Sequence, residues 1–377
     1  MLKTFKYRLF PTRNQTKALE ATLDECRWLY NHLLEQRKTA WEERKESLNY
    51  HSQAVSIPVL KQERHSLNGV HSQVLQNVAV RIDLAYKAFF RRIKSGEKPG
   101  YPRFRGKGWY DSFTFPQVPS GCSIKDGRLA VSKIGHIKII LHREMCGNPK
   151  TATIRRSSTG KWYVSFSCDV EPDRLTSNDK AVGIDVGLCS FATLSDGQAI
   201  DPPKFFRKDE KALAKAQRKL SKAEKGTSER KKRRKVVARV HERIRFRRDD
   251  FTHRHSRRIV DSYGTICVED LTVNRMIHNH CLAKSISDAA WSGFFDKLSY
   301  KAESAGRVFV KVNPAYTSQD CHKCGHRQKM PLACRTFECP CCGLHIDRDL
   351  NASLNILRLG LQSQGFTQEA VALQATE

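Results

Sequence analysis

The chain has 377 residues and a mass of 43.1 kDa, which is enough for two or three units that share one or two sizeable cores. Its 67 Lys and Arg residues outnumber 39 Asp and Glu residues, and a formal net charge of +28 predicts a polyanionic partner. No segment is apolar enough to span a bilayer or to form the core of a secretory signal, so we expect no membrane partner.

The cysteines indicate a reducing environment. There are 13 of them, an odd number, and those outside a C-terminal cluster are scattered without the regular spacing of a disulfide scaffold. We therefore expect a cytoplasmic protein.

The first half of the chain predicts strands that flank a helical region. Residues 3–9 alternate apolar with basic side chains, as in a half-buried strand, and Pro11 ends it. Apolar residues from Val70 to Ile93 recur at three- to four-residue spacing, which is typical of a helix. Glycine and proline residues break this pattern from about residue 96. The Asp126-Gly127 turn and two alternating segments then predict antiparallel β-structure up to about residue 170.

A second unit is expected to begin near Lys180. Its first strand ends at Asp185, and the segment TICVEDL predicts a buried strand that ends at Glu269. Between them, residues 204–258 contain 23 Lys or Arg against 7 Asp or Glu and predict one or two long helices joined near Gly226. Residues 287–305 read as one helix and residues 307–312 as a strand.

The charge of residues 204–258 is suited to contact with nucleic-acid phosphates. A solvated helical face is the alternative interpretation, although a segment so basic would repel itself without a polyanion.

Near the C-terminus, four cysteines have the spacing of a zinc site. Two C-x2-C pairs, each followed by glycine, are separated by 14 residues. Each pair can present two sulfurs from one tight turn, and two pairs complete a tetrahedral set that suits zinc. Cys334 and Cys341 are spare thiols in the same region. Four thiolates close the coordination sphere, so we expect a structural Zn2+ held by Cys321, Cys324, Cys339 and Cys342.

Acidic residues from three distant segments form a second candidate site. Asp185 and Glu269 stand at strand ends, and Asp347 and Asp349 open an expected helix in DRDLNASLNI. Each acid alone could cap a turn or pair with arginine. Together, in a strongly basic protein, they resemble the carboxylates that hold two divalent ions, Mg2+ or Mn2+, for phosphodiester hydrolysis.

Sequence segments along nearly the whole chain resemble the TnpB proteins, transposon-encoded RNA-guided endonucleases related to the type V CRISPR effectors. The resemblance rests on KTFKYRLFPTRNQ, QVLQNVAVRIDLAYKAFF, GIDVG, VEDL, LAKSISDAAWSGFFDKLSYKAESAG, YTSQDCHKCG, CPCCG and DRDLNASLNIL, in the same order and at similar spacing. Ser353 replaces a more usual alanine.

This resemblance implies a RuvC-type nuclease whose catalytic, magnesium-binding acids are Asp185, Glu269 and Asp349. Asp347 is the competitor for the third position, and Asp349 is preferred because the family's acid directly precedes the x-Asn-Ala segment.

The resemblance also implies the domain organisation, of an α/β plus β-barrel class. A wedge β-barrel would comprise residues 1–11 and 96–179, with a helical recognition insertion at 12–95. An RNase H-like nuclease domain would comprise residues 180–312 and 346–360, with a zinc ribbon inserted at 313–345 that binds target nucleic acid. Residues 361–377 would be a flexible C-terminal tail.

By the same resemblance, the partners are a guide RNA from the transposon end and a target double-stranded DNA. One monomer is expected to act on one RNA, in the cytoplasm of a bacterial or archaeal cell, in association with the nucleoid. The expected function is cleavage of DNA beside a short transposon-adjacent motif. A nuclease-inactive RNA-guided repressor and a transposase or recombinase that needs no RNA remain alternatives.

The readers of the DNA motif are a further hypothesis. The family reads its motif with the recognition and wedge domains, and glutamine can pair with adenine through two hydrogen bonds. Candidate nucleic-acid-binding residues are Gln73, Gln76, Ser112 and Thr114. A polar, solvated helix face is an equally good explanation of the two glutamines. Trp109 and Tyr110, beside several basic residues, could stack on bases or pack in the core.

Overall fold

The computed structural model describes residues 1–278, 280–331 and 334–365, and the chain divides into two compact units, Met1–Glu171 and Pro172–Glu377. Each unit has its own hydrophobic core. Most of the segment 361–377, expected as a tail, lies outside the described residues. Helix α9 nevertheless extends to Ser363, and Leu361 is buried. Within the described residues, no helix is long and apolar enough to cross a membrane.

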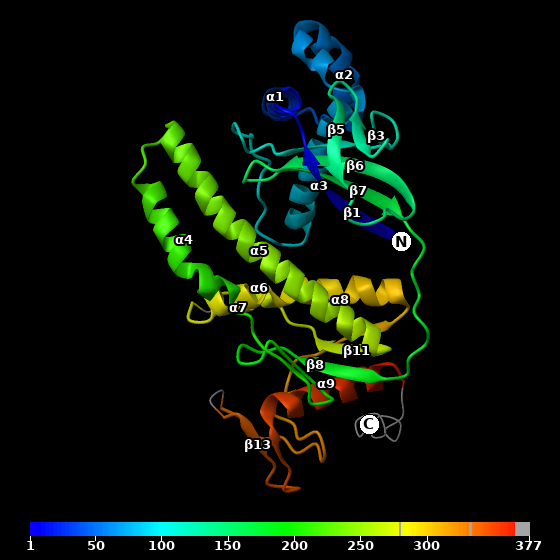
Figure 1. Cartoon of the computed structure of the whole chain (residues 1–377), viewed down its shortest axis with the longest axis vertical. Helices are drawn as coiled ribbons and strands as arrows, with labels where there is room; N and C mark the ends of the chain where they lie inside the picture. Colours follow the sequence, from blue (N-terminus) through cyan, green and yellow to red (C-terminus); the bar gives the residue numbers. More distant parts are fainter. Residues whose placement is uncertain (279, 332–333, 366–377) are drawn as a thin grey trace. The chain divides into compact units, whose positions relative to one another are not determined.

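The first unit contains a seven-stranded antiparallel sheet, curved into a nearly closed barrel (Figure 1). Its order is β2-β6-β7-β1-β5-β4-β3. Strand β1 has the predicted alternation, with Phe5, Tyr7 and Leu9 buried. The strands are β1 (Leu2–Phe10), β2 (Ser112–Phe115), β3 (Cys122–Lys125), β4 (Arg128–Val131), β5 (Gly135–Ile140), β6 (Asn148–Arg156) and β7 (Trp162–Asp169).

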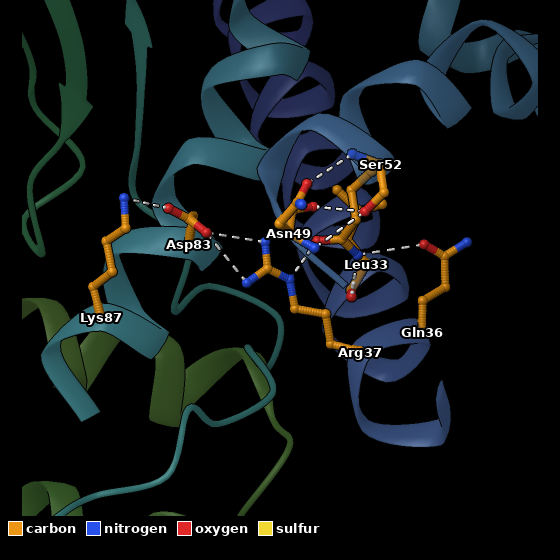
Figure 2. Close-up of polar contacts among 8 residues, drawn as sticks. Leu33, Gln36, Arg37, Asn49, Ser52, Asp83 and Lys87 are labelled. Carbon is orange, nitrogen blue, oxygen red and sulfur yellow. Dashed lines mark hydrogen bonds and ion pairs between the residues drawn. The ribbon is translucent and has the colours of Figure 1, made fainter. Parts of the chain in front are cut away.

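The helices of the first unit are α1 (Arg13–Arg44), α2 (Tyr50–Glu63), the 3-10 turn η1 (His65–Gly69) and α3 (Ser72–Lys94). Reciprocal capping boxes begin the first two, Thr12 with Gln15 and Asn49 with Ser52. A buried guanidinium then joins three helices (Figure 2). Arg37 of α1 donates to Gln53 of α2 at 2.7 Å and pairs with Asp83 of α3 at 3.4 Å.

The second unit contains a five-stranded mixed sheet of order β10-β9-β8-β11-β12. Three neighbouring strands are parallel: β8 (Ala181–Asp185), β11 (Thr265–Glu269) and β12 (Val308–Val312). Beyond β8, the strands β9 (Ala192–Leu194) and β10 (Ala199–Ile200) continue the sheet in antiparallel pairing. Because β8 and β11 are parallel neighbours, their carboxyl ends meet at one edge of the sheet.

Helices cover both faces of this sheet, as Figure 1 shows. On one face, Val182, Ile184, Ile266 and Val268 pack with α5 (Ser228–Ser262) and α8 (Trp291–Ala305). On the other, Cys267 packs with α9 (Arg348–Ser363). This alternation follows from the two-residue period of a strand.

The predicted basic helices are α4 (Phe205–Ser221) and α5, separated near Gly226. Buried acids join them to each other and to α7 (Ala283–Ala289). Asp209 of α4 pairs with Arg243 and Arg247 of α5, and Asp288 of α7 pairs with Arg248 of α5 at 2.7 Å. The carboxylates of Asp209 and Asp288 thus hold these helices together. Most of the other Lys and Arg side chains of α4 and α5 lie at the surface.

The single helix expected over residues 287–305 is wrong. Ala290 adopts a left-handed conformation, φ 57°, and separates α7 from α8. Neither glycine nor proline marks this break, so no sequence signal indicates it. A short α6 (Val273–Met276) precedes α7, and two strands, β13 (Thr336–Glu338) and β14 (His345–Asp347), pair near the cysteines.

Candidate nuclease centre and zinc site

Asp185, Glu269 and Asp349 come together from three distant segments. Asp185 and Glu269 are the last residues of β8 and β11, and the register that pairs Ile184 with Val268 puts them side by side. Asp349 lies in the first turn of α9. Burial, followed by the negative charges of Glu269 and Asp349, raises the pKa of Asp185 to about 8. The negative charges of Glu269 and Asp349 therefore both reach Asp185.

Two glycines allow α9 to lie directly on the sheet and so bring Asp349 to this edge. A Cβ atom at Gly183 would lie 2.0 Å from the carbonyl oxygen of Ser353 in α9. A Cβ atom at Gly360 of α9 would lie 2.2 Å from Sγ of Cys267 in β11. Neither glycine has a positive φ, so backbone conformation does not require glycine at these positions. Glycine is required because α9 packs too closely on the sheet to leave room for a Cβ atom.

Glu269 is the most enclosed of the three acids, with 8% of its surface exposed. Burial raises the pKa of its carboxyl group, and a hydrogen bond from Thr317 acts against this rise. Thr317 Oγ1 donates to Glu269 Oε1 at 2.6 Å. The hydroxyl group thus favours the charged form and fixes one carboxylate oxygen.

The structure distinguishes the two aspartates of the DRD segment. Asp347 is exposed and caps α9, where its carboxylate accepts hydrogen bonds from the backbone N–H groups of Asp349 and Leu350. The negative charge of Asp349 instead raises the pKa of Asp185, and its carboxylate lies 3.5 Å from the guanidinium of Arg335. This geometry favours Asp349 as the third acid.

The acids fit a hard divalent cation. They offer carboxylate oxygens from three elements, β8, β11 and α9, and no sulfur or imidazole ligand contributes to this set of three. Burial and the negative charges of Glu269 and Asp349 raise the pKa of Asp185, and a bound cation would stabilise the charged form of this carboxylate.

The four predicted cysteines form the tightest set of possible metal ligands among the described residues. Their sulfurs all lie within 4.8 Å of one another. Cys321 and Cys342 are separated by 3.6 Å, and Cys324 and Cys339 by 3.4 Å, between sulfurs. A tetrahedron of sulfurs at the usual zinc–sulfur distance of about 2.3 Å has edges of about 3.8 Å, so the set matches zinc. Both spare cysteines, Cys334 and Cys341, are exposed and outside it.

Backbone amides prepare this site for a cation. Burial opposes ionisation of Cys339, but the backbone N–H groups of Cys342 and Cys341, together with hydrogen bonds from the Cys324 and Cys342 side chains, lower its pKa. A thiolate is the form that binds zinc.

Sequence reasoning missed a group of buried polar residues next to both sites. Asn351 and Asn355 lie on α9, with at most 1% of each exposed, and both contact the segment that leads into the first cysteine pair. Thr317 belongs to the same group. The available signal was the pair of asparagines four residues apart in an otherwise apolar helix, LNASLNIL.

The candidate DNA-motif readers gather on one surface of the first unit. Gln73 of α3 donates to Gln117 at 2.7 Å, and Gln76 is exposed. Ser112 and Thr114 of β2 accept hydrogen bonds from Arg81 of α3. Arg81 was not among the candidates, although it lies eight residues after Gln73 and therefore near the same helix face.

The two aromatic candidates differ in their surroundings. Trp109 is exposed over 78% of its surface, whereas Tyr110 is buried and contacts Arg81. Of the two, only Trp109 offers a ring to an outside partner.

Comparison with known proteins identifies relatives along the whole chain. Residues 165–280 match the family OrfB_IS605, described as "Probable transposase", residues 291–356 match the Cas12f1-like TNB domain, and residues 1–46 match a helix-turn-helix domain. In this chain, residues 1–46 comprise β1, the whole of one long helix, α1, and its C-cap Lys45.

A Streptomyces pristinaespiralis protein named "Putative RNA-guided DNA endonuclease" is 37% identical over 366 residues, which cover 95% of this chain and 89% of that protein. The Escherichia coli (strain K12) protein "Putative RNA-guided DNA endonuclease InsQ" is 30% identical over 380 residues, covering 95% and 92%. Among solved structures, a cryo-EM structure of a Cas12f1–sgRNA–target DNA complex superposes with a TM-score of 0.56 at 17% identity, covering 92% of this chain and 83% of that one. This last likeness concerns the fold alone.

Proposed function

Because the chain belongs to the family of TnpB-like RNA-guided DNA endonucleases, we propose that it cuts DNA at a divalent-metal site formed by Asp185, Glu269 and Asp349. The observation that carries this proposal is the meeting of three carboxylates at one sheet edge, with the pKa of Asp185 raised by burial and by its two acidic neighbours. The repressor alternative is not favoured, because all three acids are present. A transposase that acts without RNA is not favoured either, given the relatives.

We further propose that the second unit is an RNase H-like nuclease with an inserted zinc ribbon. A mixed sheet with acids at adjacent parallel strand ends, covered by helices on both faces, supports this assignment. The first unit would then be the wedge barrel with its helical recognition insertion. We retain the expected domain ranges as part of this proposal; the boundary expected between residues 179 and 180 lies eight residues after the junction of the two compact units at Glu171 and Pro172.

The proposed chemistry divides the work among the acids. Bound Mg2+ or Mn2+ would activate a water for attack on the phosphodiester and stabilise the leaving oxygen. Asp185, at the centre, would face the ions together with both other acids. Glu269, held by Thr317, would present a fixed carboxylate, and Asp349 would do so from the start of α9. Zinc at the cysteine set would have a structural role only.

Helices α4 and α5 are the proposed surface for guide RNA and target DNA backbones. They contain most of the 23 basic residues counted above, and most of these side chains are not engaged in the buried pairs with Asp209 and Asp288. Phosphate contact of this kind gives affinity without sequence preference. We propose one copy of the chain per RNA, acting in the cytoplasm in association with the nucleoid.

The proposed DNA-motif readers are Gln73, Gln76, Ser112 and Thr114. Gln76 is free to face DNA, whereas Ser112 and Thr114 would act together with Arg81, to which they are hydrogen-bonded. Alanine variants of Gln73 and Gln76 should change the preferred DNA motif. If both variants kept the parental preference, the two glutamines would be withdrawn as readers.

RNA dependence is the test that separates this function from a transposase. The protein purified with its RNA should cut DNA that matches the guide and carries the adjacent motif, and digestion of that RNA should abolish the cleavage. Sequence-specific cleavage that survives complete RNase digestion would contradict the proposal. Sequencing the co-purified RNA supplies the guide needed to design the DNA substrate.

A further inference from the structure

A buried hydrogen-bond network connects the first zinc-binding cysteine pair, the helix that carries Asp349, and Glu269. Asn355 donates to the backbone carbonyls of Thr317 and Asp320, at 2.9 and 2.6 Å. Asn351 donates to the same Asp320 carbonyl at 2.8 Å and accepts from the backbone N–H of His322 at 3.0 Å. Asp320 and His322 flank the zinc ligand Cys321.

The side chain of Thr317 completes the connection. Its hydroxyl group donates to Glu269 Oε1 at 2.6 Å, with the carbonyl of Pro314 at 3.3 Å as an alternative acceptor. Thr317 is 4% exposed, and Asn351 and Asn355 are 0% and 1% exposed, so water cannot readily replace these bonds.

We propose that Thr317, Asn351 and Asn355 form a latch that sets the positions of the metal-binding acids, and that Thr317 is the positioning residue for Glu269. This inference rests on the proposed nuclease function of the same acids. Asn351 lies two residues after Asp349 on the same helix, so the bonds that fix segment 317–322 also fix the start of α9. Glu269 at the end of β11 and Asp349 at the start of α9 are thereby both connected to segment 317–322.

The latch acts on metal binding through geometry. A carboxylate that ligates a metal keeps its orientation when an outer group bonds one of its oxygens, and loss of such a partner typically costs about 10- to 100-fold in metal affinity or activity. Thr317→Val removes the hydroxyl group with little change of shape. Thr317→Ser keeps the donor and is the matched control.

The experiment compares the parent, both Thr317 variants and Glu269→Gln, each as the full chain with its co-purified RNA. Two quantities are measured: Mn2+ binding, by electron paramagnetic resonance of free Mn2+, and the Mg2+ concentration that gives half-maximal DNA cleavage. Because RNA also binds Mn2+, binding at the acid site is taken as the difference from Glu269→Gln. Zinc content and the unfolding transition are recorded for every variant.

Thr317→Val should retain zinc and a cooperative unfolding transition, because the hydroxyl group that it removes contacts Glu269 and Pro314 and none of the four cysteines. It should bind Mn2+ about 10- to 100-fold more weakly and need correspondingly more Mg2+ for cleavage, and Thr317→Ser should behave close to the parent.

Parental Mn2+ binding and Mg2+ dependence in Thr317→Val would overturn the latch, as would loss of zinc or of folding in that variant, or an equal defect in Thr317→Ser. Failure of the proposed function looks different: Glu269→Gln would then bind Mn2+ and cut DNA as well as the parent.

Discussion

Gly183→Ala should disable the nuclease although the added methyl group touches no acid. Gly183 stands two residues before Asp185 in β8, and the added Cβ would lie 2.0 Å from the carbonyl oxygen of Ser353 and 2.6 Å from the backbone nitrogen of Leu357. Both atoms belong to the backbone of α9, so no side-chain rotation can relieve the contact. The helix must move away from the strand, and Asp349 must move with it.

The size of the effect follows from these distances. A carbon atom tolerates an oxygen at about 3.3 Å, so the backbones must separate by about 1 Å. Overpacking of this kind costs about 1–3 kcal/mol of stability. A misplacement of about 1 Å at a catalytic centre can cost about 100-fold in rate. Cleavage should therefore fall about 100-fold while most of the protein stays folded.

The assay measures single-turnover cleavage of a guide-matched DNA and urea unfolding of the same preparations. Gly293→Ala is the control, since Gly293 lies in α8 and an added Cβ there meets only Nζ of Lys297, at 3.8 Å. That variant should cut normally and gain about 0.5–1 kcal/mol, as expected for alanine in a helix. Parental cleavage by Gly183→Ala would refute the account of how α9 positions Asp349.

Three further predictions concern zinc, a buried ion pair and pH. Cys339→Ala should lose zinc, measured by metal analysis. It should also lose cleavage, because zinc would hold Cys339 to the first cysteine pair and that pair is joined to α9. Zinc loss with normal cleavage would contradict this. Asp83→Asn leaves the Arg37 guanidinium without its anion and should cost about 2 kcal/mol in urea unfolding, as expected when a buried donor loses its partner. Lys87→Ala, which removes the exposed partner of Asp83, should cost at most about 1 kcal/mol. Equal losses would argue against a buried pair. Because the pKa of Asp185 is about 8, Mn2+ must displace its proton, and Mn2+ affinity should be higher at about pH 8.5 than at about pH 6.5; equal affinities would exclude a protonated Asp185.

The raised pKa of Asp185 also determines how the free energy of unfolding depends on pH. The pKa of Asp185 is higher in the folded protein than in the unfolded chain, where it is about 3.9. The metal-free protein should therefore lose stability progressively as the pH rises from about 4 to about 8 and change little above that, and Asp185→Asn should remove that dependence.

Local patterns were sufficient to predict the elements that carry the site. The alternation of β1, the Asp126-Gly127 turn and the separation of two basic helices near Gly226 all have short-range causes, and the structure confirms them. The cysteine spacing likewise predicted a set of sulfurs that the structure brings within reach of one ion.

Features that depend on distant partners could not be predicted in the same way. The left-handed Ala290 interrupts a stretch whose own sequence favours a continuous helix. Asn351 and Asn355 find their partners 31 and 38 residues earlier in the chain. Ser112 and Thr114 find theirs in Arg81. Periodicity places such side chains on a face but does not identify the group that they contact.

Asp185→Ala tests the central claim most directly. The variant, purified with its RNA, is compared with the parent for binding and for Mg2+-dependent cleavage of the same guide-matched DNA. The account predicts that Asp185→Ala retains the RNA and binds the target but does not cut it, because the acid that faces both other carboxylates is missing. Cleavage at the parental rate would contradict it.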